Sequence, residues 1–298
     1  MSDFVQQQNC ICDFATSDSW VILSPIEQSI KKKIESVGTP LKDWDINIYR
    51  GVLTGCNEAF IINSQKRDEI LANCQTEDER QRTATLIRPI LRGRDIKRYG
   101  YVDNGLYLIN THNGVRGRIP RIKIEDYPAV KAHLDQYWDR IATRADKGDT
   151  PYNLRNCAYL EDFSRPKVMW KIIGCNINFC FDEGQLICNN AVDIMVGDRN
   201  NLIQFVGLMN SKLFDWYLKL TTEAEVQGGG IQLYVTTLEK TLLKLDFQQD
   251  FTDIVYQRIE NQITDEAVDK AVFEAYRLTT EEQAFILQDR RVNRNRED

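Results

Sequence analysis

The sequence has no long apolar run and very few histidines. No stretch reaches the roughly 18 apolar residues of a membrane-spanning helix, and the opening MSDFVQQQNC lacks the apolar core of a signal peptide. We therefore expect a cytoplasmic protein without membrane contact. Only His112 and His133 are present in 298 residues, so catalysis that depends on histidine has little to work with.

Metal-binding patterns are also missing. The chain has eight cysteines, but Cys175, Cys180 and Cys188 do not stand at usual zinc-ligand spacings, and both histidines lie well upstream of them. Eight cysteines in a chain of this length fit reduced thiols better than a disulfide framework. We predict buried free thiols and no metal site.

Familiar catalytic and nucleotide-binding motifs do not occur. The sequence contains no G-x-S-x-G, no H-E-x-x-H, no Walker A loop and no strand-linked G-x-G-x-x-G, and no pair of carboxylates stands out by its spacing. We therefore predict no catalytic residues. An enzyme of unrecognised type stays as the third hypothesis for this chain.

What is present is the pattern of a soluble α+β protein. Apolar content of 42% and charged content of 28% are ordinary for a globular chain, and 298 residues can build one large domain or two. Short alternating stretches and longer ones with helical spacing predict mixed or antiparallel sheets with packed helices. Strands are predicted at 20–23, 45–50, 107–111, 167–173, 176–181, 185–188, 191–197 and 231–235. Helices are predicted at 25–37, 127–146 (with Trp138 on its apolar face) and 201–220. A turn with a returning strand is predicted at 50–63, and a charged helical connector follows at 64–88.

From Asp246 the composition changes. Residues 246–289 contain eleven Asp or Glu but only three Lys or Arg, and strand signals end there. We predict one domain over residues 1–245, followed by an acidic helical C-terminal module over 246–298. Its Arg-rich tail, RRVNRNRED, is expected to be disordered.

The chain is acidic overall, with a net charge of −6, yet one segment is strongly basic. Residues 88–123, which we call the basic segment, contain nine Lys or Arg and two Asp. Its first twelve residues read RPILRGRDIKRY. Within them, Ile90 and Ile96 are expected to be buried in the hydrophobic core, while Arg92 and Arg94 flank an exposed bend at Gly93. A positive island in a negative protein favours a polyanionic partner, although a solvated surface paired with acids elsewhere explains the charge equally well.

Several segments together resemble one known family. The segments that carry this resemblance are DWDINIYRGVLTGCNEAFIIN, IRPILRGRDIKRY, GLYLINT, YPAVKAHLDQYWDRIATRADKG, FSRPKVMWKI, NSKLFDWYLK and GGGIQLYVTTLEK. Over roughly residues 30–245 and in this order, they resemble the TaqI-like C-terminal specificity domain, which is the target-recognition module of type IIG restriction-modification enzymes and adenine-N6 DNA methyltransferases. The methyltransferase half is missing, because neither N-P-P-Y nor a Gly-rich S-adenosylmethionine motif occurs.

The resemblance implies that the chain recognises double-stranded DNA for fused or separate methyltransferase or nuclease domains. S-adenosylmethionine and Mg²⁺ are expected only in those catalytic domains, so this chain is expected to hold no cofactor. Basic side chains would hold phosphates, and a few polar ones would contact base edges. The residues predicted to contact DNA are Arg88, Arg92, Arg94, Lys97, Arg98, Arg116, Arg118, Arg121, Gly55, Asn57, Lys167, Trp170 and Lys171.

Two alternatives stay open. Trp170 is a large apolar residue in a predicted strand, and a place in the core is the competing interpretation for it. For the whole chain, the acidic helical end favours a second hypothesis, in which the protein positions a partner methyltransferase without contacting DNA itself.

Overall fold

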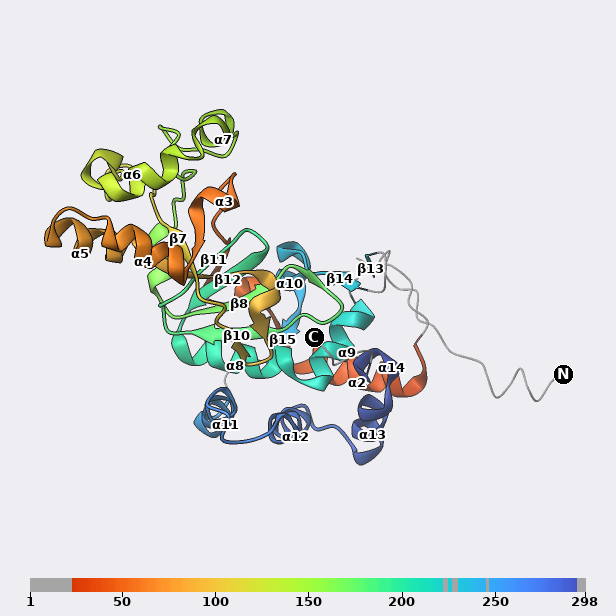
Figure 1. The fold of residues 1–298 in the computed structure, drawn as a ribbon. Coiled ribbons are helices and arrows are strands. Elements are labelled where there is room, and N and C mark those ends of the chain that lie inside the picture. The colour runs from red at the N-terminus through yellow and green to blue at the C-terminus, as the bar shows by residue number, and fades with distance from the viewer. Residues whose placement is uncertain (1–22, 222–224, 227–229, 245–246, 294–298) are drawn as a thin grey trace, which may run out of the picture.

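The computed structural model describes residues 23–221, 225–226, 230–244 and 247–293. Helices and short strands are mixed along these ranges, and the expected α+β fold is confirmed. Figure 1 shows a lobe built around α3–α7 that stands on a larger body containing the sheets and the remaining helices. No helix in the described ranges is long and apolar enough to cross a membrane.

The elements have the following bounds. The helices are α2 (Pro25–Val37), α3 (Asn57–Phe60), α4 (Ser64–Ala72), α5 (Glu77–Leu86), α6 (Pro128–Asp135), α7 (Trp138–Thr143), α8 (Arg199–Asn210), α9 (Lys212–Thr221), α10 (Val235–Lys240), α11 (Gln249–Ile259), α12 (Asp265–Ala275), α13 (Thr280–Gln288) and α14 (Arg290–Asn293), with 3₁₀ turns η1 (Leu41–Asp43), η2 (Gly93–Asp95), η3 (Ile124–Asp126) and η4 (Leu160–Ser164). The strands are β1 (Thr39–Pro40), β2 (Ile46–Arg50), β3 (Ile61–Asn63), β4 (Ile87–Leu91), β5 (Ile96–Lys97), β6 (Gly100–Tyr101), β7 (Leu106–Ile109), β8 (Lys167–Lys171), β9 (Ile173–Gly174), β10 (Phe179–Asp182), β11 (Ile187–Cys188), β12 (Val192–Gly197), β13 (Glu225–Val226), β14 (Gly230–Gln232) and β15 (Leu242–Leu243).

Two four-stranded sheets form the framework. One has the order β10-β8-β12-β2 and is antiparallel throughout. The other has the order β11-β4-β7-β3 and is mixed, because β11 runs parallel to β4. The chain crosses from the second sheet to the first between β11 and β12, through residues 189–191.

The antiparallel sheet is buried on both faces. Along β8, Val168 and Trp170 join one hydrophobic core, whereas Met169 joins the other, and all three are fully buried. Successive side chains of a strand point to opposite faces, so a sheet between two cores needs apolar residues at every position. This arrangement explains why the sequence KVMWKII shows no alternation.

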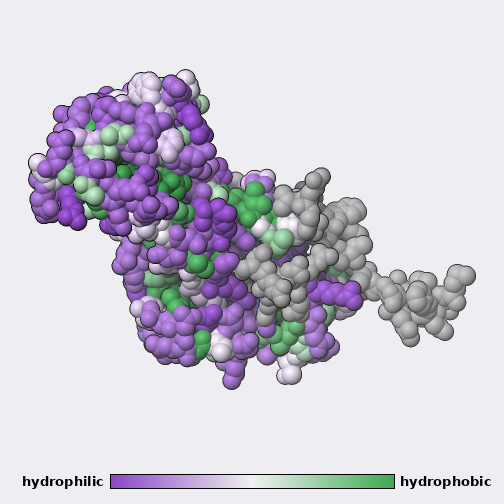
Figure 2. Space-filling view, in the orientation of Figure 1, coloured by the Kyte–Doolittle hydropathy of each residue, from purple (hydrophilic) through white to green (hydrophobic). Residues whose placement is uncertain are grey.

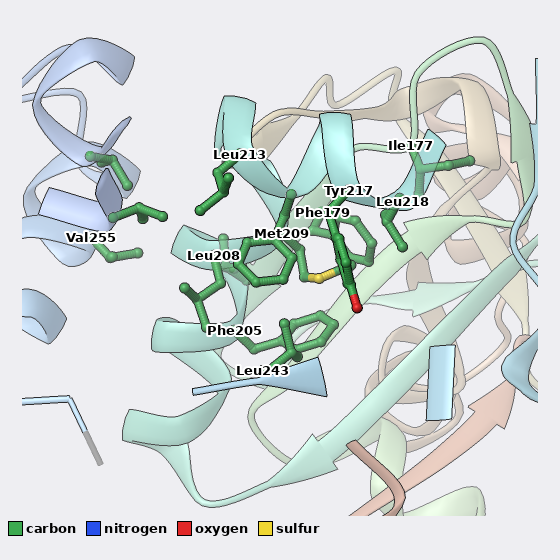
Figure 3. Close-up of a cluster of buried hydrophobic side chains, with 14 of the residues drawn as sticks. Ile177, Phe179, Phe205, Leu208, Met209, Leu213, Tyr217, Leu218, Leu243 and Val255 are labelled. Carbon is green, nitrogen blue, oxygen red and sulfur yellow. The ribbon is translucent and has the colours of Figure 1, made fainter. Parts of the chain in front are cut away.

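The first core lies between this sheet and the helices of the body. Figure 3 shows Phe205 and Leu208 of α8 close to Tyr217 of α9, with Val255 of α11 on the opposite side. Gly207 of α8 packs so closely on Val255 that a Cβ at this position would overlap the valine methyl group. The C-terminal helices therefore belong to this core, and the predicted boundary near residue 246 does not separate two hydrophobic cores.

The second core fills the lobe and the other face of the sheet. Phe60, Val130, Leu134 and Ile141 from the lobe pack there with residues of both four-stranded sheets. Figure 2 shows that hydrophilic residues dominate the visible surface of the lobe. The lobe is therefore an extension of the body and shares its core.

Two long helices of the sequence prediction are broken in the structure. The segment 127–146 forms α6 and α7 with an interruption at 136–137, and Trp138 is 44% exposed rather than in the core, where it packs on Tyr152 at 5.5 Å between ring centroids. The segment 201–220 divides at Ser211, whose hydroxyl donates to Leu208 O at 2.6 Å and accepts from Phe214 N at 3.3 Å. A serine that satisfies groups on both sides ends one helix and begins the next.

The returning strand expected within 50–63 is present as β3, but it does not pair with the strand before the turn. Residues 57–60 form a helical turn, and β3 leaves the sheet of β2 to pair with β7. At the C-terminus, Arg290–Asn293 forms α14 rather than a disordered tail, because Arg291 pairs with Glu27 at 2.5 Å and with Asp289 at 2.6 Å. Three predicted parts lie outside the described residues: 294–298, Trp20 to Ile22 of the predicted edge strand, and Gly228 and Gly229. Leu23, the last residue of that predicted strand, is buried just before α2 and is not in a strand.

Candidate nucleic-acid interface

Two of the residues predicted to contact DNA are inside the protein. Lys167 and Trp170 both have 0% exposed surface, because β8 is an inner strand with a core on each face. The Lys167 ammonium donates to Phe163 O at 2.8 Å and forms an ion pair with Asp182. Burial lowers the pKa of Lys167, and the Asp182 carboxylate opposes that shift. These two predictions are wrong, and the core interpretation holds for Trp170.

Three arginines within residues 88–99 are held by partners within the chain. Arg88 donates to Ser164 Oγ at 3.1 Å and approaches the carbonyls of Gly184 and Gln185, and burial lowers its pKa. Arg98 donates to Asn210 O and pairs with Asp265 of α12 at 3.2 Å. Both side chains therefore connect parts of the fold, and Arg98 ties the basic segment to the C-terminal helices.

Arg92 is the third paired arginine. It forms a bidentate pair with the buried Asp95, with Nε–Oδ2 and Nη2–Oδ1 distances of 3.0 Å each, and Asn104 donates to the same carboxylate at 2.8 Å. Burial acts to raise the pKa of Asp95, but the hydrogen bonds from Arg92 and Asn104 outweigh it and hold the pKa below its usual range. The expectation that Arg92 faces outward as Arg94 does is therefore wrong, whereas Ile90 and Ile96 are buried as predicted.

Among the predicted contact residues in 88–99 and 167–171, the cations that remain available are Arg94, Lys97 and Lys171. Arg94 is exposed, Lys97 and Lys171 are half-buried, and none of them has an ion pair or side-chain hydrogen bond with a described residue. Lys97 lines a cavity of about 300 Å³ together with Arg98. At a different place, Gly93, which directly precedes Arg94, packs against Lys171: a Cβ built at Gly93 would stand 3.3 Å from Lys171 Cβ.

Arg94 and Lys171 belong to a place where four segments meet, which we call the junction edge: residues 50–52, 92–95, 171–173 and 189–191. Backbone hydrogen bonds join these segments around the crossing between the two sheets. They run from Val52 N to Cys188 O (2.7 Å), Gly51 N to Val192 O (2.8 Å), Asn189 N to Leu91 O (3.0 Å), Val192 N to Asn189 O (3.0 Å) and Ile172 N to Ala191 O (3.1 Å).

Two glycines allow the segments to come so close. A Cβ at Gly51 would overlap the carbonyl of Asn189, and one at Gly93 would come within 3.3 Å of the carbonyl of Ala191. Neither glycine has a positive φ, so close packing rather than backbone conformation requires them. The turn 189–191 is thereby held between two neighbouring strands.

The junction edge also contains residues that the sequence analysis missed. Arg50 has a side chain that is 62% exposed, 3.7 Å from the buried Asp193, and Asn189 and Asn190 occupy the turn itself. Burial raises the pKa of Asp193 to about 6, with Arg50 acting in the opposite direction. Two adjacent asparagines between two predicted strands were the available signal, because Asn favours turns and offers an amide for recognition.

Exposed apolar side chains border Lys171. Ile173 is 53% exposed and Tyr234 is 48% exposed. Ile173 pairs with Gln232, and Leu233 N donates to Ile172 O at 2.9 Å, so continuing this register places Tyr234 opposite Lys171. The edge therefore combines cations, amides and apolar groups, which are the side-chain types that contact phosphates and bases.

A second basic surface adjoins this edge. The loop 113–121 lines a cavity of about 760 Å³, in which Arg116 forms no ion pair with a described residue. Arg118 pairs with Glu161 at 3.0 Å and donates to Ala158 O at 3.1 Å, and Arg121 pairs with Asp149 at 3.2 Å. The next residue after Ala158 is Tyr159, whose hydroxyl donates to Arg50 O at 2.9 Å. The loop and the junction edge are thus linked through residues 158–159.

Gly55 and Asn57 lie at the start of the lobe. Gly55 has a φ of +66°, and Asn57 Oδ1 accepts a hydrogen bond from Thr54 at 2.6 Å. The neighbours of Gly55 are Arg144 and Asp146, which are not part of the junction edge. Asn57 itself is exposed. No group of His, Cys, Asp or Glu in the described part of the chain could hold a metal ion.

The fold occurs in two solved restriction-modification enzymes. The type IIG restriction endonuclease BpuSI matches with a TM-score of 0.51 and 13% identity, over 80% of this chain and 28% of the enzyme. The type IIL enzyme MmeI, solved in complex with DNA, matches with a TM-score of 0.54 and 11% identity, over 84% of this chain and 36% of the enzyme. The chain thus spans well under half the length of either enzyme.

The sequence itself gives the family. The sequence model of the TaqI-like C-terminal specificity domain matches residues 88–241, and the chain belongs to that family. The match includes the basic segment, β8 and the turn 189–191. A comparison with curated protein sequences found no significant match.

Proposed function

We propose that the chain is the sequence-specific DNA target-recognition module of a restriction-modification enzyme or a related adenine-specific DNA methyltransferase. Catalysis then belongs to domains outside this chain, fused to it or separate. Membership of the specificity-domain family supports this proposal. The observation that carries it is the junction edge, where Arg94 and Lys171 have no partner among the described residues, in a chain whose net charge is −6.

The physical argument concerns where positive charge is available. A protein holds DNA by placing Lys and Arg against phosphates and releasing counterions, so cations that are already paired contribute little. Asp95 belongs to the edge and Asp193 lies beside it near the start of β12, but both are buried and each has an arginine beside it. The edge is therefore positive although the protein as a whole is negative.

Binding to duplex DNA tests the proposal. Fluorescence anisotropy with a random-sequence duplex, followed by selection from a random duplex library, should show binding at roughly 50 mM salt that weakens steeply towards 200 mM. Selection should enrich a defined sequence. Binding that does not depend on salt, or selection that enriches no sequence, would contradict the proposal.

An activity assay tests the second half of the proposal. The purified chain, incubated with S-adenosylmethionine, Mg²⁺ and mixed-sequence DNA, should neither methylate nor cut the DNA. Methyl transfer that persists through further purification would show that the chain itself carries catalytic residues.

The acidic C-terminal helices support a second candidate function, docking of a protein partner. Tyr256 on α11 and Leu287 on α13 are exposed apolar residues in that region. A chain that binds a separately expressed methyltransferase but no duplex DNA at low salt would favour this candidate over DNA recognition.

A further inference from the structure

We propose that the side chain of Asn190 contacts the base edge of an adenine and gives the chain specificity for an A·T pair at one position of its target. This inference rests on the proposed function, because it assigns a base-contacting residue within the DNA interface. It concerns a residue that the basic charge pattern does not reveal.

The turn 189–191 is unusually well fixed for a surface segment. Its backbone is hydrogen bonded to Leu91 of β4, to Ile172 after β8 and to Val192 at the start of β12. Gly51 and Gly93 pack against its carbonyl groups from two further segments. A side chain that must distinguish bases needs a rigid support of this kind, because a mobile side chain accommodates several partners.

The two asparagines of the turn differ in what their amides do. Asn189 Oδ1 accepts a hydrogen bond from Ala191 N at 3.4 Å, so this side chain stabilises the turn. Asn190 is half-buried, and its amide has no hydrogen-bond partner among the described residues. The donor and the acceptor of the Asn190 amide are therefore both available to a ligand.

Basic residues stand next in sequence to both glycines, Gly51 and Gly93, that pack against the turn 189–191. Gly93 is followed by Arg94 and packs on Lys171, and Gly51 follows Arg50. Phosphate contacts made by these residues would fix the position of the duplex against the turn, and only then can a short side chain reach a base edge reproducibly.

The chemistry of an amide selects adenine. In the major groove, adenine offers the N7 acceptor beside the N6 amino donor, which match the NH₂ and C=O of asparagine as a bidentate pair. Guanine offers two acceptors there, so an asparagine can satisfy only one of them. The neighbouring Ala191 is exposed, and a methyl group is suited to apolar contact with the thymine methyl.

The test uses the preferred sequence selected by the wild-type chain and a panel of duplexes with each base pair replaced. For Asn190→Ala, discrimination at one A·T position should fall by between about 5-fold and about 150-fold, the value of a good bidentate contact. Replacing that adenine by 7-deazaadenine, which lacks the N7 acceptor, should weaken the wild type but leave Asn190→Ala unchanged. Asn200→Ala, an exposed amide at the start of α8, is the matched control and should behave as wild type.

A second variant guards against simple loss of binding. Asn190→Asp keeps the size of the side chain but can only accept, so the preferred base at that position should change from adenine towards cytosine, which presents the N4 amino donor. If the wild type is selective and both variants keep its discrimination at every adenine, this inference is wrong and the proposed function stands. If the wild type selects no sequence, the proposed function itself fails.

Discussion

The two ends of strand β8 make the most instructive comparison in this molecule. Lys167 begins the strand and Lys171 ends it, and both belong to the sequence KVMWK. Lys167 is fully buried against Asp182, whereas Lys171 is half-buried at the junction edge without an ion pair to any described residue. The basic segment shows the same division, because Arg88 and Arg98 have partners and Arg94 has none among the described residues. A basic side chain is therefore available to a ligand only where the fold provides no carboxylate or carbonyl for it.

The largest effect is expected at the buried end of β8. Lys167→Met leaves Asp182 as a buried charge without its cation, which should lower the free energy of unfolding by about 3–5 kcal/mol. Lys171→Met, four residues along the same strand, should change it by less than about 0.5 kcal/mol while weakening DNA binding. Urea unfolding of both variants measures the difference. Equal losses of stability in the two variants would mean that Lys167 and Lys171 contribute alike to the fold, which would contradict this account of the two ends of β8.

A slightly smaller effect concerns Asp193, which lies beneath the junction edge beside Arg50. Burial raises its folded-state pKa from 3.8 to about 6. Between about pH 3.8 and pH 6 the folded protein therefore binds more protons than the unfolded chain. As the pH rises through this range, the contribution of Asp193 to the free energy of unfolding falls by about 3 kcal/mol. Asp193→Asn should remove this dependence and make the protein more stable than wild type at pH 7.

Urea unfolding between roughly pH 4.5 and pH 7.5 measures that contribution. The difference in the free energy of unfolding between Asp193→Asn and wild type should grow in favour of the variant across this range. A constant difference would mean that Asp193 titrates normally and that Arg50 neutralises it fully.

Arg92 and Arg94 give the third comparison: Arg92 directly precedes the 3₁₀ turn η2, and Arg94 is the middle residue of that turn. Arg92→Ala removes two hydrogen bonds to the buried Asp95 and should cost about 1–3 kcal/mol of stability. Arg94→Ala should cost less than about 0.5 kcal/mol, because its side chain is exposed and has no partner among the described residues. Thermal melts of the two variants separate these outcomes, and a reversed order would make Arg94 the structural residue and Arg92 the available one.

Much of the fold could be predicted from local pattern. Helix α2 follows from its Ser24 cap, Pro25 at its first position and the spacing of Ile30 and Ile34, which are fully buried. The helix breaks at Ser211 and at 136–137 could not be predicted, because no Gly or Pro stands there and the helical spacing of the apolar residues continues through both breaks. The strand β3 likewise leaves its sequence neighbour β2 for the distant β7, a choice that only the packed lobe decides.

The candidate site could be predicted only in part. Arg94 and Lys171 were found by their charge, but the sequence does not show which arginines meet a carboxylate, since the partner of Arg98 is 167 positions away at Asp265. Arg50 and Asn190 were missed because they come from segments outside the basic run. The crossing of the chain from one sheet to the other brings them to the same edge.

The salt dependence of DNA binding tests the role of the junction edge most directly. The double variant Arg94→Ala, Lys171→Ala should show a smaller log–log slope of affinity against salt than wild type, by about 1 for each cation removed. The matched control, Lys32→Ala with Arg277→Ala, removes the same charge from two exposed cations elsewhere, on α2 and just before α13, and should keep the wild-type slope. If the control lowers the slope as much as the double variant, DNA binding reflects net charge alone and the junction edge is not the interface.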